Sequence, residues 1–175
     1  MSDDGYETSV DVDGDGSWDQ HTTESDGQGG QYVYADMNGD GDADFVGHDE
    51  DGNGTIDAAK YDNNYDGYFE QQTGDTDGDG WQNAEVSDNN EDGVTDEAGR
   101  DTNQDGHFDQ RAYDNNEDGK VDEVVLDRNL DGSDDYDARD TNYNGTADTV
   151  TTDSNFNGNY DTVHNTNNEA NPFAS

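Results

Sequence analysis

Apolar residues are sparse in this chain and recur in a register of 13 residues. One apolar column of the repeat comprises Trp18, Ala43, Ile56, Phe69, Phe108, Val121, Ala147 and Tyr160. Further Val, Leu and Phe residues follow that column, and the segments 120–126 and 146–152 are typical of short β-strands. No amphipathic helical period survives, because Gly, Asp and Asn interrupt every repeat. The pattern therefore predicts an all-β or irregular fold with short strands.

A glycine at position 6 anchors every repeat. The repeats begin at residues 11, 24, 36, 49, 62, 75, 88, 101, 114, 127, 140 and 153, and only the second is one residue short. Position 1 is Asp or Glu, position 3 is Asp or Asn, and positions 5 and 9 are almost always Asp, Asn or Glu. The consensus D-x-[DN]-x-[DN]-G-x-x-[DE], with four further residues, defines a tandem array.

The chain divides into three segments. Residues 11–165 hold the twelve repeats, and the second of them, 24–35, departs from the consensus and is predicted to be degenerate. Residues 1–10 and 166–175 each carry a partial loop, and we expect the end of one copy to complete the beginning of the next. The predicted assembly residues are Asp3, Asp4, Val10, Asn168 and Phe173.

Oxygen-bearing side chains at positions 1, 3, 5 and 9 around a glycine suit a hard cation. Ca²⁺ takes six to eight oxygen ligands at about 2.3–2.6 Å, and a tightly curled loop can supply them. Glycine at position 6 permits the sharp turn, and the backbone carbonyl of position 7 adds a ligand. The spacing therefore predicts about eleven Ca²⁺ sites, one in each repeat except the degenerate one.

The predicted ligands follow from this register. The side-chain ligands are Asp11, Asp13, Asp15, Asp19, Asp36, Asn38, Asp40, Asp44, Asp49, Asp51, Asn53, Asp57, Asp62, Asn64, Asp66, Glu70, Asp75, Asp77, Asp79, Asn83, Asp88, Asn90, Asp92, Asp96, Asp101, Asn103, Asp105, Asp109, Asp114, Asn116, Asp118, Asp122, Asp127, Asn129, Asp131, Asp135, Asp140, Asn142, Asn144, Asp148, Asp153, Asn155, Asn157 and Asp161. The backbone carbonyl ligands are those of Ser17, Asp42, Thr55, Tyr68, Trp81, Val94, His107, Lys120, Ser133, Thr146 and Asn159.

The loops Asp11-Val-Asp-Gly-Asp-Gly16 and Asp75-Thr-Asp-Gly-Asp-Gly80 resemble the thrombospondin type 3 class of calcium repeat, which also occurs in bacterial surface proteins. The resemblance covers about residues 11–165 and lacks that family's cysteines. The first five ligands also resemble the EF-hand loop, but four residues between loops leave no room for flanking helices. The resemblance implies a Ca²⁺-bound array of loops.

Position 12, where the EF-hand has a bidentate Glu, carries no acid here. We expect position 1 of the following repeat, such as Asp62, Asp75 or Asp88, to bind the preceding ion as well as its own. The reduced ligand set also predicts modest affinity, on the order of 10⁻⁴–10⁻³ M, as in extracellular modules. This favours an extracellular or cell-surface location, although the first residues lack the basic and apolar regions of a signal peptide.

The composition also indicates that folding depends on metal. Six basic residues against 47 acidic ones give a net charge of −41, and only 25% of residues are hydrophobic. Such a chain is expected to be disordered without a cation. The charge excludes binding of nucleic-acid phosphates. The absence of Cys excludes disulfides and thiolate sites, and no apolar stretch is long enough for a membrane span.

Two architectures remain open. In the repeats that begin at residues 62 to 114 the first residues alternate, which predicts a calcium-stabilised, solenoid-like array with 26 residues per coil. The alternative is a meandering string of loops with little sheet. A turn-rich acidic repeat that binds no metal is a further alternative, because Asp, Asn and Gly also form turns.

The sequence predicts a structural protein and not an enzyme. The four histidines occupy four different positions of the repeat, so no catalytic constellation recurs. We expect a subunit of an extracellular filament or stalk that folds and assembles head-to-tail on Ca²⁺. The alternative is a monomeric calcium buffer, storage or mineral-binding protein, and hydrolysis at a calcium site is a third possibility.

Overall fold

The computed structural model describes residue 12 and residues 16–166. The predicted ligands Asp11, Asp13 and Asp15 lie outside these residues, as do the predicted assembly residues. The described part contains twelve strands and no helix: β1 Gln20–Ser25, β2 Gln31–Asp36, β3 Phe45–Asp49, β4 Ala58–Tyr61, β5 Gln71–Gly74, β6 Ala84–Ser87, β7 Glu97–Arg100, β8 Gln110–Tyr113, β9 Glu123–Leu126, β10 Tyr136–Arg139, β11 Thr149–Thr152 and β12 Thr162–Asn165. The all-β prediction is confirmed, and β9 and β11 lie inside the two segments predicted as strands.

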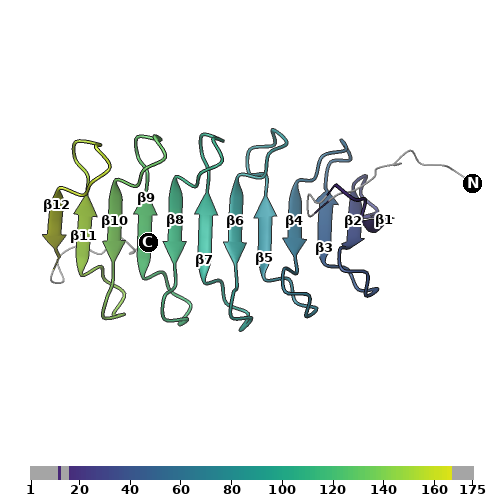
Figure 1. Cartoon of the computed structure of the whole chain (residues 1–175), viewed down its shortest axis with the longest axis horizontal. Coiled ribbons are helices and arrows are strands. Elements are labelled where there is room, and N and C mark those ends of the chain that lie inside the picture. Colours follow the sequence, from purple (N-terminus) through teal and green to yellow (C-terminus); the bar gives the residue numbers. More distant parts are fainter. Residues whose placement is uncertain (1–11, 13–15, 167–175) are drawn as a thin grey trace, which may run out of the picture. The chain divides into compact units, whose positions relative to one another are not determined.

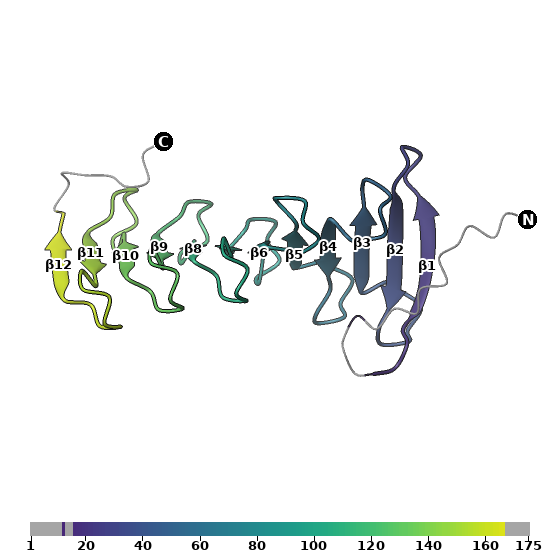
Figure 2. The same cartoon turned by 90° about the horizontal axis from the view of Figure 1, so that it is seen from above.

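The chain forms two compact units, Met1–Gln72 and Thr73–Ser175. In the first unit, β1 to β4 pair in chain order, each antiparallel to the next. In the second unit, β6 to β12 pair in the same way. Strands β1 to β3 have five or six residues, whereas those of the second unit have four. Figure 2 shows β1 to β3 as long arrows. Each unit is therefore an antiparallel meander.

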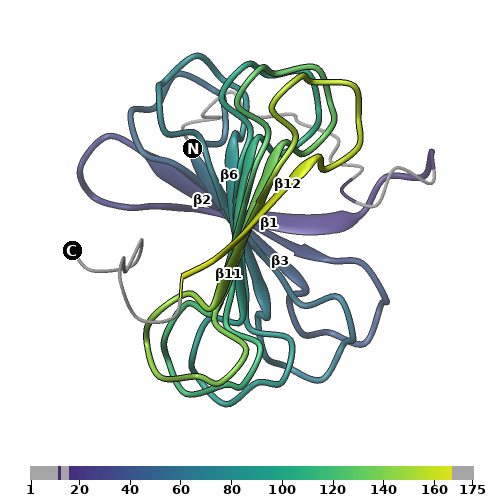
Figure 3. The ribbon, with the colours of Figure 1, turned by 90° about the vertical axis from the view of Figure 1, so that its left-hand side faces the viewer.

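The meander explains the 13-residue period. In the second unit nine residues form a loop and the remaining four form a strand. Within each unit consecutive loops therefore lie at opposite ends of the strands, and each row of strand ends is called an edge (Figures 1 and 3). In the second unit, loops 75–83, 101–109, 127–135 and 153–161 occupy one edge, and loops 88–96, 114–122 and 140–148 the other. The 26-residue alternation is thus the spacing of loops along one edge, not the two-sided coil that we expected.

The apolar core of the first unit is a small cluster. Val33, Ala35, Phe45 and Ala59 are buried together. The ring of Tyr61 packs against Phe45 with the two centroids 5.2 Å apart. This unit therefore has an apolar core on its strands, against which Met37 and Ile56 pack from the loops.

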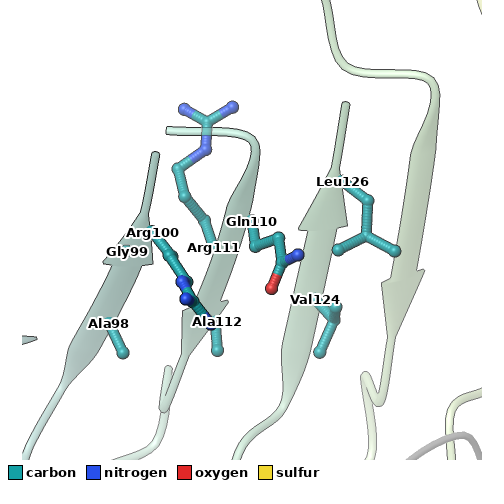
Figure 4. A pocket seen from close by; sticks show the side chains of 8 residues that line it. All are labelled: Ala98, Gly99, Arg100, Gln110, Arg111, Ala112, Val124 and Leu126. Atoms are coloured by element: carbon teal, nitrogen blue, oxygen red, sulfur yellow. The ribbon is translucent and has the colours of Figure 1, made fainter. Parts of the chain in front are cut away.

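The second unit has even less apolar material. Its buried hydrophobic side chains, among the described residues, are Val125, Ala138 and Ala147. Ala98, Ala112 and Val124 lie opposite one another on β7, β8 and β9 (Figure 4). Because these side chains are small, they leave a hollow of about 240 Å³ on the sheet. Its apolar packing alone gives this unit little stability.

A glycine on β7 lets a loop residue cover this sheet. A Cβ atom added to Gly99 would lie 2.8 Å from Cδ2 of Phe108, which occupies position 8 of loop 101–109. We expect Gly99→Ala to lower the free energy of unfolding by about 1–3 kcal/mol, because the ring must move. Urea denaturation in Ca²⁺ measures this. The loss should shrink in a Phe108→Leu background, and an equal loss there would show that the ring is not the cause.

Candidate metal centres

Each loop is named here by its residues from position 1 to position 9. The backbone hydrogen bond that closes a loop runs from the N–H of position 9 to the carbonyl oxygen of the residue before position 1. The bond is seen in nine loops, with N···O distances of 2.7–3.0 Å, as for Asp109 and Arg100. Positions 1 and 9 are therefore brought together at the neck of each loop.

The carboxylate of position 1 holds the sharp turn. In ten loops its Oδ2 accepts a hydrogen bond from the N–H of the position 6 glycine at 2.6–2.9 Å. These glycines have positive φ, for example 88° at Gly106, a conformation that glycine adopts without strain. In nine of these loops the other oxygen, Oδ1, also accepts a hydrogen bond from the N–H of position 3, 4 or 5, so both oxygens of position 1 hold the turn.

Position 9 has a matching role. In ten complete loops its side-chain oxygen accepts a hydrogen bond from the N–H of position 2 at 2.6–3.2 Å. The side-chain oxygens of positions 3 and 5 accept bonds from N–H groups two residues later, as Asn103 does from Asp105 and Asp105 from His107. The side chains at all four predicted ligand positions therefore belong to one hydrogen-bonded loop.

The buried positions that apolar side chains occupy in most proteins are occupied here largely by carboxylates. The largest fully buried side chains of the described residues are those of Asp44, Asp62, Asp135, Asp140 and Asp153, each at 1–2% exposure. All of them are predicted ligands at position 1 or position 9. A buried carboxylate is costly unless a cation or hydrogen-bond donors compensate its charge.

Among the described residues, two buried oxygen atoms at ligand positions have no hydrogen-bond partner. They are Oδ1 of Asp140, at position 1 of its loop, and Oε2 of Glu70, at position 9 of its loop. Their other oxygens accept bonds from Gly145 and Asn63. An unpaired buried carboxylate oxygen is the observation expected where a cation ligand is buried. The donor set consists of oxygen atoms only, which fits a hard divalent cation.

Two loops bring three carboxylates especially close. One oxygen each of Asp49, Asp51 and Asp57 lies within 4.8 Å of the others, and the same holds for Asp75, Asp77 and Asp79. These groups could hold a metal ion. Hydrogen bonds from the N–H of Gly80, and then from those of Gly78 and Asp77, keep the pKa of Asp75 below its usual value. At neutral pH this carboxylate is charged and able to bind a cation.

Burial has the opposite effect in loop 114–122. Desolvation raises the pKa of Asp122 above its usual value, although the N–H groups of Asn116 and Asn115 donate to it. Lys120 donates to Asp118 at 2.7 Å, and this bond lowers the pKa of Asp118. The loops therefore differ electrostatically despite their common backbone.

The degenerate second repeat folds differently. Residues 26–30 connect β1 and β2 as a short turn. Oδ1 of Asp26 accepts bonds from the N–H groups of Gln28, Gly29 and Gly30, and its Oδ2 lies 3.4 Å from Nε2 of His48. The hydrogen bond from Gln28 is the largest cause that lowers the pKa of Asp26. Both oxygens of this carboxylate are thus used within the protein.

The prediction that position 1 of the following repeat shares the preceding ion is wrong. Strand β6 separates loop 75–83 from Asp88, and β9 separates loop 114–122 from Asp127. A four-residue strand spans about 13 Å, far beyond a metal–oxygen bond. Asp75 is likewise separated from loop 62–70 by β5, and Asp62 from loop 49–57 by β4.

The true neighbour of a loop is the loop two repeats later. The N–H of position 1 donates to the carbonyl oxygen of position 9 in the preceding loop on the same edge, as Asp127 does to Asp109 at 2.8 Å. Six such bonds join loops within the units, at 2.7–2.9 Å, and Thr166 makes the equivalent bond to Asp148. Ligand residues of successive loops along an edge are therefore linked through the backbone.

The consensus leaves position 4 unrestricted, yet its backbone conformation is conserved from loop to loop. Position 4 has positive φ in every described loop, with glycine in some and residues such as Gln104 (φ 60°), Glu117 (φ 62°) and Leu130 (φ 60°) in others. The recurrence of glycine at this position in the early repeats, Gly14, Gly27, Gly39, Gly52 and Gly78, is the signal that could have revealed it.

Arg128 competes for the ligands of its own loop. Its Nε pairs with Oδ1 of Asp135, and its backbone N–H donates to Oδ2 of the same carboxylate at 2.9 Å. Both oxygens of the position 9 ligand are thus occupied. Thr102 and Thr141 occupy position 2, the position of Arg128, in two other loops. Arg128→Thr should therefore strengthen Ca²⁺ binding by loop 127–135 roughly two- to fivefold, the value of a partly exposed ion pair.

The amide NMR signal of Gly132, followed during a Ca²⁺ titration, measures this change. Thr141→Ser is the control, because it changes position 2 of another loop and removes no charge. Unchanged or weaker binding at Gly132 in the Arg128→Thr variant would show that the ion pair does not oppose the cation.

The hollow on β7 to β9 offers no comparable chemistry. Its lining combines apolar side chains with Gln110 and two arginines, Arg100 and Arg111, and contains no carboxylate or nucleophile (Figure 4). Among the described residues, no helix is present that could cross a membrane. Comparisons of the chain with protein-family models, curated proteins and solved structures found no match.

Proposed function

We propose that this chain is a calcium-binding structural repeat protein whose loops each hold one Ca²⁺ and whose strands pack only when the ions are bound. Up to eleven loops take part, and the degenerate repeat does not. The resemblance to thrombospondin type 3 and bacterial calcium repeats supports this proposal, as does the oxygen-only donor set.

The observation that carries the proposal is the buried carboxylate at position 1 or position 9 of eight of the described loops. At least one oxygen of position 1 and one of position 9 bind backbone N–H groups, and in loops 140–148 and 62–70 a second, buried oxygen has no hydrogen-bond partner. A metal-free acidic turn would gain nothing from placing charged groups at 1–2% exposure. A divalent ion at each loop would offset two of the 41 net negative charges.

The proposal extends to assembly. Strand β12 is the last strand of its sheet. It pairs with β11 on one side, and no described strand pairs with its other side. All four of its side chains are exposed. An exposed strand edge is a template for another chain, and head-to-tail addition would give an extracellular or cell-surface filament or stalk.

Isothermal titration calorimetry tests the binding, with about eleven Ca²⁺ per chain expected. Electron microscopy in Ca²⁺ and in EGTA tests the assembly, with filaments expected only in Ca²⁺. Particles that remain monomeric at saturating Ca²⁺ would favour a buffer or storage protein instead. A chain that binds no Ca²⁺ would contradict the proposal as a whole.

A further inference from the structure

Loop 75–83 lacks the carboxylate that the other complete loops have at position 9. Asn83 stands there, and its Oδ1 accepts hydrogen bonds from the backbone N–H of Thr76 at 3.0 Å and from Oγ1 of Thr76 at 2.7 Å. A carbonyl oxygen has two lone pairs, so this oxygen is fully used. The prediction of Asn83 as a side-chain ligand therefore does not fit its contacts.

A side chain from another loop contacts the predicted ligands of this loop. Nε2 of Gln104, from position 4 of loop 101–109, is 2.7 Å from Oδ2 of Asp79 and 3.3 Å from Oδ2 of Asp77. These two residues belong to the group of three carboxylates with oxygens within 4.8 Å of one another. The Gln104 amide thus lies at the cluster that would surround the cation.

Gln104 is held in this place by its own loop and by the link between the two loops. Its backbone N–H donates to Oδ1 of Asp101 at 2.6 Å, and the N–H of Asp101 donates to the carbonyl oxygen of Asn83 at 2.9 Å. Nη2 of Arg100 donates to Oγ1 of Thr76 at 3.1 Å. Two contacts, in addition to those of the Gln104 side chain, therefore join residues 100–104 to loop 75–83.

We propose that Gln104 completes the cation site of loop 75–83, with its amide oxygen in place of the ligand that Asn83 does not supply. A half-turn of the amide exchanges Nε2 for Oε1, and amide oxygens are ligands for Ca²⁺. The inference rests on the proposed function. Its consequence is that the site belongs to two loops, so ion binding in 75–83 depends on the folding of 101–109, its neighbour along the edge.

Trp81 provides a reporter for this one site. It occupies position 7 of loop 75–83 and is 72% exposed. The chain has two tryptophans, so Trp18→Phe leaves Trp81 as the sole indole. Tb³⁺, a luminescent substitute for Ca²⁺, emits when excited through a nearby indole. In the Trp18→Phe protein, indole-sensitised emission therefore reports mainly on binding at loop 75–83, because the sensitisation falls steeply with distance.

In this background, Gln104→Gly should raise the Tb³⁺ concentration at half-saturation about tenfold, the usual effect of losing a group that supports a metal site. Glycine is the appropriate replacement because Gln104 has φ 60°. Gln104→Glu should lower the concentration, since it adds a charged oxygen ligand. The matched control is Glu117→Gly, a change at position 4 of loop 114–122, which should leave the signal unchanged.

The outcomes separate the two proposals. An unchanged half-saturation with Gln104→Gly, or weaker binding with Gln104→Glu, would overturn the role of Gln104 and leave metal binding intact. A loss in Glu117→Gly equal to that in Gln104→Gly would also overturn it, because any disturbed loop would then have the same effect. No sensitised emission in the background protein would overturn the proposed function and this inference with it.

Discussion

Removal of Ca²⁺ with EGTA is expected to unfold the second unit. Its largest fully buried side chains are carboxylates such as Asp135, Asp140 and Asp153, and its buried apolar residues are few. Without a cation the buried charges repel one another at low dielectric constant, and the free energy of binding is lost from folding. Circular dichroism should lose its β signal, and small-angle scattering should show a large increase in the radius of gyration.

The first unit should lose less structure, because it has the apolar cluster around Phe45. Hydrogen exchange in EGTA should therefore leave the amides of β2 and β3 better protected than those of β8 to β10. Sodium chloride added to the EGTA sample is the control, since it screens charge without occupying the loops. An unchanged radius of gyration in EGTA, or recovery of the fold by sodium chloride alone, would contradict the proposed role of the cation.

The repeat was a strong guide to the local structure. The consensus predicts a glycine turn at position 6, and in ten loops the N–H of that glycine binds the carboxylate of position 1. The strands at 123–126 and 149–152 follow from β-branched and apolar residues after each loop. These features are local, so spacing within one repeat suffices to predict them.

The order of the strands in space could not be predicted in the same way. An alternation every 26 residues fits both a coil and a meander, since both return to one side after two repeats. The antiparallel pairing, with Ala98 opposite Ala112, decides between them. The contact of Gln104 with Asp79 depends on that pairing, because the two residues are 25 apart in sequence. No pattern within one repeat could have indicated it.

Asp140→Asn is expected to be the most damaging single substitution in the loops. Oδ2 of Asp140 accepts bonds from the N–H groups of Gly145 at 2.6 Å and Thr146 at 3.0 Å, and its Oδ1 is the buried atom without a hydrogen-bond partner. Asparagine has only one oxygen, so its NH₂ group must face either the N–H groups of Gly145 and Thr146 or the cation, and the charge that would bind the cation is lost. Loss of one member of a buried charge pair costs about 3–5 kcal/mol.

Urea denaturation in saturating Ca²⁺ measures this loss, and Glu117→Gln is the matched control. Glu117 is exposed at position 4 of loop 114–122, on the same edge, so its change removes one charge and should alter the free energy of unfolding by less than about 0.5 kcal/mol. The backbone N–H of Asp140 also donates to the carbonyl oxygen of Asp122 at 2.7 Å. The damage should therefore appear in the NMR signals of loop 114–122 more than in those of loop 127–135, although the latter is closer in sequence. Equal damage to both loops would mean that stability spreads along the chain instead of along the edge.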